Sequence, residues 1–188
     1  YQNNFKMFYK MNVNDEINNF FLKNKFFSKK LTSKKIVGNY DLIYSIYVIE
    51  HFNDKEIEYF LNNIKSKSKF YIFIIDFADT YFIDKWIDET DKYKFQYLKY
   101  SDTLWNIINN KFIYQSRLRV NDYKKLFINY GFDIVEFKRC NTLCEEKNEE
   151  YFTNKNFDIK EYNKKFHKYS ETDMLTYKGV FILKDKDA

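Results

Sequence analysis

The 188 residues are within the usual size of one domain, and a 45% share of apolar residues can fill a sizeable core, so we expect a single globular domain over residues 1–188. The net charge of +5 comes from 32 basic and 27 acidic residues that are mixed along the chain, so nucleic-acid binding is not indicated. No apolar run is long enough to span a bilayer, and the first residues lack the apolar segment of a signal peptide, which argues against a membrane partner.

The composition is biased, with no proline, 3 glycines, 18 tyrosines and 21 phenylalanines. An A+T-rich genome explains such a bias, so the aromatic residues are weak support for base stacking. The only two cysteines, Cys140 and Cys144, have a spacing that matches neither a disulfide framework nor a zinc site. We therefore expect reduced thiols, no bound metal and a cytoplasmic location.

The first elements in chain order are a predicted helix and a predicted strand. Residues 14–27 place apolar side chains at near-helical spacing, and residues 28–39 are typical of a loop with a short strand near residues 35–37. Residues 40–46 form a nearly continuous apolar run, which is typical of a strand buried on both faces of a parallel sheet.

A helix and a second strand follow. Asn53 and Glu56 have the spacing of a capping box, in which the Asn side chain accepts from a free helix N–H and the Glu side chain bonds back. The helix behind them would bury one apolar face, made of Ile57, Phe60, Leu61 and Ile64. Residues 69–76 predict a strand that ends in an acid, so residues 40–76 have the length of a right-handed strand–helix–strand crossover.

The pattern weakens over residues 77–119, where we expect an insertion that covers a substrate. Ser101 predicts the cap of a short helix that carries Leu104, Ile107 and Ile108. A clearer helix is predicted over residues 121–130, with Gly131 as its left-handed stop. Strands are predicted over residues 132–137 and 176–184, and a weaker helix between them would hold Ile159, Tyr162 and Phe166.

The predicted strand over residues 40–46 is followed by Glu50 and His51, at positions where turn-forming residues are usual. In open α/β sheets, ligands bind outside the carboxyl ends of the strands. Side chains between residues 45 and 51 therefore become candidates for a binding site.

These residues resemble the class I S-adenosylmethionine-dependent methyltransferases. The signature of their fourth strand stands here as Tyr40-Asp41-Leu42-Ile43-Tyr44-Ser45 and Val48-Ile49-Glu50-His51-Phe52. The resemblance continues in order through Ile75-Asp76 with Asp79, Tyr97-Leu98-Lys99-Tyr100-Ser101 with Trp105, Arg117-Leu118-Arg119 with Asp122-Tyr123, and Tyr130-Gly131-Phe132. It covers the chain from about residue 36 to the end.

The resemblance implies an α/β, Rossmann-like sheet that is mostly parallel, with residues 36–188 supplying strands four to seven and residues 132–184 an antiparallel hairpin at one edge. The family's Gly-rich cofactor loop is missing, because Gly38, Gly131 and Gly179 are isolated. The first residue is Tyr1 rather than Met. We therefore expect an N-terminally incomplete domain that holds the back half of a cofactor pocket.

The resemblance also implies roles for the residues after the first strand. Ser45, Ile46 and Tyr47 would line the methionine side of S-adenosylmethionine, and Glu50 and His51 would face the methyl-transfer cleft. His51 is the better general base, since imidazole titrates near ~6.5. Methyl transfer can also proceed by alignment alone, and a histidine at a helix start can simply bond the backbone. The resemblance favours the functional interpretation of His51.

Other polar residues have two interpretations each. Asp76 and Asp79 would hold a turn or contact substrate. Arg117 and Arg119 would grip an anionic group of the substrate bidentately or form ordinary ion pairs. Trp105 is expected in the core rather than in a substrate platform, and the remaining histidine, His167, in solvent.

The expected function is methyl transfer from S-adenosylmethionine to an oxygen or nitrogen of a small-molecule or sugar-like acceptor, with the isolated chain inactive. A non-catalytic binding or scaffold domain that has lost the cofactor half is the alternative. An RNA-binding module ranks last, because only the pI of 8.9 and the aromatic residues favour it.

Overall fold

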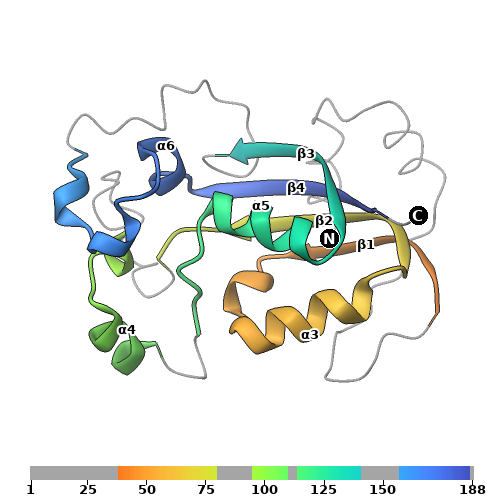
Figure 1. Ribbon diagram of the computed structural model, residues 1–188, viewed down its shortest axis with the longest axis horizontal. Helices are drawn as coiled ribbons and strands as arrows, with labels where there is room; N and C mark the ends of the chain where they lie inside the picture. The colour runs from red at the N-terminus through yellow and green to blue at the C-terminus, as the bar shows by residue number, and fades with distance from the viewer. Residues whose placement is uncertain (1–37, 80–94, 110–113, 141–156, 187–188) are drawn as a thin grey trace. The chain divides into compact units, whose positions relative to one another are not determined.

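A four-stranded mixed sheet is the centre of the computed structural model, which describes residues 38–79, 95–109, 114–140 and 157–186 (Figure 1). The strands are β1 (Tyr40–Ile46), β2 (Ser68–Asp76), β3 (Phe132–Cys140) and β4 (Lys178–Asp185), in the order β1-β2-β4-β3. The helices of the described ranges are α3 (Asp54–Ile64), α4 (Asp102–Ile108), α5 (Val120–Asn129) and α6 (Glu171–Met174). The predicted helix over residues 14–27 and strand near residues 35–37 lie outside these ranges.

The pairing of the strands confirms two predicted units. β1 and β2 are parallel, with Tyr40 opposite Ser68 and Ile46 opposite Ile74, and α3 connects them as the predicted crossover. β3 and β4 are antiparallel, and β4 also pairs antiparallel with β2, so the predicted hairpin lies at one edge. Of the strand pairings in the described ranges, only β1–β2 is parallel. The described part of the domain is therefore α/β with a mixed sheet. The expected mostly parallel sheet is not shown.

The capping box at the start of α3 is present as predicted. Asn53 Oδ1 accepts from the backbone N–H groups of Lys55 and Glu56, both at 3.1 Å, and Glu56 Oε2 accepts from the Asn53 N–H at 2.8 Å. These bonds satisfy donors that the first turn of a helix leaves free. The predicted apolar face is buried throughout, at Ile57, Phe60, Leu61 and Ile64.

α3 and α5 pack on the same face of the sheet, because both contact Phe73 of β2 (Figure 1). Phe60 of α3 meets the Phe73 ring at 6.0 Å between centroids, and Phe127 of α5 meets it at 5.0 Å. α5 ends before Gly131, whose φ of +84° is the left-handed conformation predicted for the stop. Aromatic rings of helices and strands therefore form the main core.

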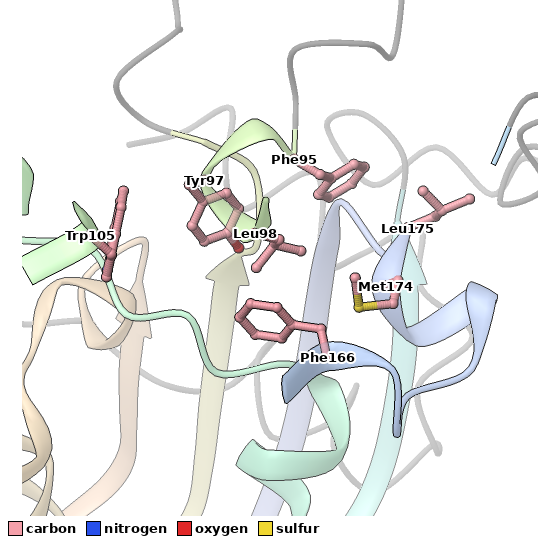
Figure 2. Close-up of a cluster of buried hydrophobic side chains, with 7 residues drawn as sticks. All are labelled: Phe95, Tyr97, Leu98, Trp105, Phe166, Met174 and Leu175. Atoms are coloured by element: carbon pink, nitrogen blue, oxygen red, sulfur yellow. The ribbon is translucent and has the colours of Figure 1, made fainter. Parts of the chain in front are cut away.

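A second hydrophobic cluster combines side chains of residues 95–105, which follow β2, with side chains of residues 166–175, which precede β4 (Figure 2). Ser101 caps α4 as predicted, accepting from the Leu104 N–H at 3.2 Å. The buried face differs from the prediction, since Leu104 and Ile107 are exposed while Trp105 is only 4% exposed. Trp105 is thus a core residue, as expected. The cluster consists of Phe95, Tyr97, Leu98, Trp105, Phe166, Met174 and Leu175.

The predicted weak helix between β3 and β4 is replaced by two 3₁₀ turns, Ile159–Glu161 and Lys164–Phe166. Asp158 and Asn163 each begin one turn, because their side chains accept from the backbone N–H groups of Lys160 and Lys165. Such local bonds compete with a continuous helix. The prediction of one helix that holds Ile159, Tyr162 and Phe166 was therefore wrong.

The capping box predicts a measurable share of the stability. Replacing Asn53 by Ala removes the acceptor for two backbone N–H groups, so the free energy of unfolding should fall by about 1 kcal/mol. Asn62→Ala, at an exposed position within α3, is the matched control and should leave stability unchanged or raise it slightly. Urea denaturation of both variants measures the difference, and equal stabilities would contradict the role of the cap.

Candidate functional site

Polar side chains converge at one end of the strands, where β1 and β2 end and β4 begins. Parallel strands bring their carboxyl ends to one edge, and antiparallel β4 brings its first residue to the same place. Lys178, the first residue of β4, is the register partner of Asp76, the last residue of β2. We call Tyr47, Glu50, His51, Asp76 and Lys178 the strand-end cluster.

Tyr47 and Lys178 hold each other at this edge. The Lys178 ammonium lies 4.7 Å from the centroid of the Tyr47 ring and 5.2 Å from that of Tyr177, and it donates to the Tyr47 hydroxyl at 3.3 Å. Tyr47 adopts a φ of +54°, a left-handed conformation that costs energy in a residue with a large side chain. Its N–H donates to the Ile74 carbonyl at 2.9 Å, which fixes this turn to β2.

Gly179 explains how Lys178 reaches its place. A Cβ atom at Gly179 would lie 2.9 Å from the Phe137 ring and 3.0 Å from the Phe77 ring. Only glycine therefore lets β4 pass so close to both rings.

Glu50 is the buried acid at the end of the first strand. It is 2% exposed, its Oε1 accepts from the Asp76 N–H at 3.1 Å, and its Oε2 has no hydrogen-bond partner. Burial, with a smaller contribution from the Asp76 carboxylate, raises the pKa of Glu50 to about 8. The side chain is therefore mostly a neutral carboxylic acid at pH 7, and it links the ends of β1 and β2.

His51 lies next to Glu50 on the 3₁₀ turn Ile49–His51. Its Nδ1 is 2.8 Å from the carbonyl oxygen of Tyr114, and since a carbonyl only accepts, Nδ1 carries the proton in this contact. In the neutral ring the lone pair is then on Nε2. The contact matches the backbone-bonding interpretation of His51, and it also leaves the tautomer that a general base needs.

Asp76 and Asp79 both hold turns after β2. Asp76 Oδ1 accepts from the Ala78 N–H at 2.9 Å, and Asp79, which is fully buried, accepts from the Tyr97 N–H at 2.9 Å. Burial raises the pKa of Asp76, while the Ala78 N–H and the Lys178 charge oppose the rise. Asp76 belongs to the strand-end cluster, whereas Asp79 anchors the 3₁₀ turn Gln96–Leu98.

Arg117 and Arg119 are bound inside the protein. Arg119 is fully buried, and its five N–H groups donate to four backbone carbonyls and to the Tyr97 hydroxyl at 2.8–3.3 Å. Arg117 donates to the Tyr100 carbonyl at 2.8 Å and pairs with Asp102. Arg117 thus forms an ion pair with an exposed carboxylate, whereas the side-chain N–H groups of Arg119 are all bonded within the protein.

The structure thus brings together some of the predicted site residues and not others. Tyr47, Glu50, His51 and Asp76 form one cluster, and Ser45 and Ile46 lead into it from β1. Asp79, Arg117 and Arg119 contact the chain around Tyr97 instead. Lys178 is a cluster member that the sequence reasoning missed. Its signal was a single charged residue at the start of the apolar run in TYKGVFILK.

Comparisons with known proteins found neither a family model nor a curated protein that matches this chain. The described ranges contain no group of three or more histidine, cysteine or acidic side chains that could hold a metal ion. Helices in the same ranges lack the length and apolar character that a membrane crossing requires.

Glu50 predicts a specific dependence of stability on pH. The folded protein keeps the Glu50 proton up to about pH 8, whereas the unfolded chain releases it near 4.5, so the folded state binds more protons between these values. The free energy of unfolding should therefore fall as the pH rises through this window. Glu50→Gln keeps the acceptor for Asp76 and has no proton to lose, so its stability should fall less steeply.

Urea denaturation at a series of pH values from about 5 to 8 measures the two slopes. Glu58→Gln, at an exposed position on α3, is the matched control and should follow the unsubstituted protein. Parallel curves for the unsubstituted protein and Glu50→Gln would show that Glu50 ionises normally.

Arg119 predicts a large loss of stability on substitution. Arg119→Met removes the donors that this side chain supplies to the carbonyls of Met174 and Thr176 and one of the two donors to the Phe77 carbonyl, so the free energy of unfolding should fall by about 3–5 kcal/mol. Arg139→Met, at an exposed site on β3, should cost less than about 1 kcal/mol. Urea denaturation compares them, with Arg119→Lys as a milder variant if Arg119→Met does not fold. Similar losses at both positions would contradict this account.

Proposed function

We propose that this domain belongs to an S-adenosylmethionine-dependent methyltransferase that methylates an oxygen or nitrogen of a small-molecule or sugar-like acceptor. The observation that carries the proposal is the strand-end cluster, which lies at the sheet edge where open α/β sheets bind ligands. The same residues carry the family resemblance in the sequence.

The sheet supports the proposal in a second way. The order β1-β2-β4-β3, with the antiparallel hairpin at one edge, is compatible with strands four to seven of a Rossmann-like methyltransferase sheet. β1, the proposed fourth strand, is the outer strand of the described sheet on the side away from β3. Strands one to three would continue from that edge.

The residues after β1 suit the methionine side of the cofactor. Ser45 and Ile46 end the strand, and the left-handed turn at Tyr47 directs the chain away from the sheet. Bound S-adenosylmethionine would supply an electrophilic methyl group at this edge. The described ranges contain no Gly-rich loop, so they supply one side of the pocket.

In the proposed reaction, the protein orients the acceptor and handles one proton. Ser45, Ile46 and Tyr47 would hold the methionine side of the cofactor, which would supply its methyl group to the acceptor oxygen or nitrogen and keep the carbon–sulfur bonding pair on sulfur. His51 Nε2 takes the proton from a hydroxyl acceptor, because Nδ1–H is held by the Tyr114 carbonyl. Glu50 is a positioning residue that fixes the Asp76 backbone.

The alternative, a non-catalytic binding or scaffold domain, has its own support. Asp79 and Arg119 use their polar groups in contacts within the protein rather than in an open site. A domain of this kind predicts that the complete natural polypeptide containing these residues does not bind S-adenosylmethionine.

Equilibrium dialysis of that complete polypeptide with radiolabelled S-adenosylmethionine separates the two functions. We expect saturable binding that unlabelled S-adenosylhomocysteine displaces. Tyr47→Gly removes the ring while its backbone keeps the left-handed turn, so the affinity should fall about tenfold. Ser66→Gly, at the other left-handed non-glycine residue of the described ranges, should leave the affinity unchanged.

Two results would count against the proposal. Absence of binding by the complete polypeptide favours the scaffold function. Binding that Tyr47→Gly leaves unchanged shows that the cofactor lies elsewhere than at the end of β1.

A further inference from the structure

A second candidate site is a cavity of about 440 Å³ beside α4, the 3₁₀ turn Lys164–Phe166 and the first turns of α3 and α5. Figure 1 shows α3 and α5 both beginning on the side of the molecule where α4 lies. The volume is within the range of small-molecule sites. None of Tyr47, Glu50, Asp76 and Lys178 lines it, so the cavity is separate from the strand-end cluster.

Aromatic side chains form the inner wall of the cavity. Trp105 and Phe166 line it and are 4% and 2% exposed, and both belong to the second hydrophobic cluster (Figure 2). Tyr114, Leu118 and Tyr169 also line it and are half-buried, so they leave apolar surface open to a ligand. This wall suits an apolar or aromatic group.

Positive charge is in excess on the side of the cavity formed by α4 and the turn Lys164–Phe166. Arg117 and Lys165 both pair with the single carboxylate of Asp102. Lys168 is exposed, and its ammonium lies 4.9 Å from the centroid of the Tyr169 ring. Three cations and one carboxylate therefore line this side, and two of the cations pair with that carboxylate.

Negative charge lies on the side formed by the helix starts. Asp54 is exposed in the first turn of α3, and Asp122 is in the first turn of α5. Asp122 Oδ2 accepts from the Tyr169 hydroxyl at 2.7 Å and from the backbone N–H of Arg119 at 2.8 Å. The charges of the whole lining cancel: two of the three carboxylates come from the helix starts, whereas the three cations are Arg117, Lys165 and Lys168.

We propose that this cavity binds a zwitterion with an apolar body, the chemical class of α-amino acids with aromatic or large aliphatic side chains. The carboxylate would lie toward Lys165 and Lys168, and the ammonium toward Asp54, with the side chain against the aromatic wall. A ligand with one charge would meet a like charge on one side and lose an opposite charge on the other. The inference does not depend on the proposed methyltransferase function.

Three probes with the same phenyl body test the charge requirement. They are L-phenylalanine, 3-phenylpropanoate, which has only the carboxylate, and 2-phenylethylamine, which has only the ammonium. Trp105 reports binding by its fluorescence in a Trp86→Phe background, where it is the only tryptophan left. We expect saturable binding of L-phenylalanine in the low-millimolar range and several-fold weaker binding of both analogues at low salt.

Paired substitutions test the two sides. Lys168→Gln and Asp54→Asn should each weaken L-phenylalanine binding about two- to fivefold, the effect of an exposed ion pair. Their controls are Lys164→Gln, on the 3₁₀ turn that precedes Lys168, and Glu58→Gln, on the same helix as Asp54, since neither residue lines the cavity. Both controls should bind as the parent does.

Each contrary result overturns the proposal. Absence of a saturable signal with L-phenylalanine removes the site. Equal affinity for 3-phenylpropanoate or 2-phenylethylamine shows that one charge suffices, and unchanged affinity in Lys168→Gln and Asp54→Asn shows that the charged walls are not used.

Discussion

The buried guanidinium of Arg119 is the interaction on which the rest of the described structure depends. It bonds the carbonyl of Phe77 after β2, the hydroxyl of Tyr97, and the carbonyls of Asp173, Met174 and Thr176 before β4. The β2–β4 pairing already brings the first and the last of these segments together, and the Phe77 N–H donates to the Tyr177 carbonyl at 2.7 Å. A buried charge is costly unless its donors are satisfied, and here carbonyl dipoles satisfy all of them. One side chain thus connects the segment around Tyr97, which lies outside the sheet, to the paired ends of β2 and β4.

The strand-end cluster follows from this connection. Arg119 fixes the chain that leads into β4, and β4 then places Lys178 opposite Asp76. Glu50 is buried between the ends of β1 and β2, where water cannot stabilise its charge, so it keeps its proton at neutral pH. The cluster therefore combines a neutral acid, a carboxylate and a lysine within one edge of the sheet.

Local patterns in the sequence predict the regular elements well, and long-range contacts explain what they miss. The capping box of Asn53 and the apolar face of α3 depend on neighbours within a few residues, so both were predicted correctly. The role of Arg119 depends on carbonyls 42–57 residues away, which no local pattern reveals. Lys178 belongs to the site only through the register of β4 against β2, and sequence periodicity does not determine that register.

Residues 114–119 show why the site and the cavity both escape periodicity. They have no regular secondary structure, yet the Ser116 N–H donates to the Glu50 carbonyl at 2.7 Å and the Tyr114 carbonyl bonds His51 at 2.8 Å. The Tyr114, Arg117 and Leu118 side chains line the cavity. Because the backbone of this segment serves the strand-end cluster and its side chains serve the cavity, an irregular stretch of chain is the physical boundary between the two sites. Its conformation is maintained by partners from the 3₁₀ turns Ile49–His51 and Gln96–Leu98 and from α4 and α6. A helix or strand in this segment would not give the conformation on which both sites depend.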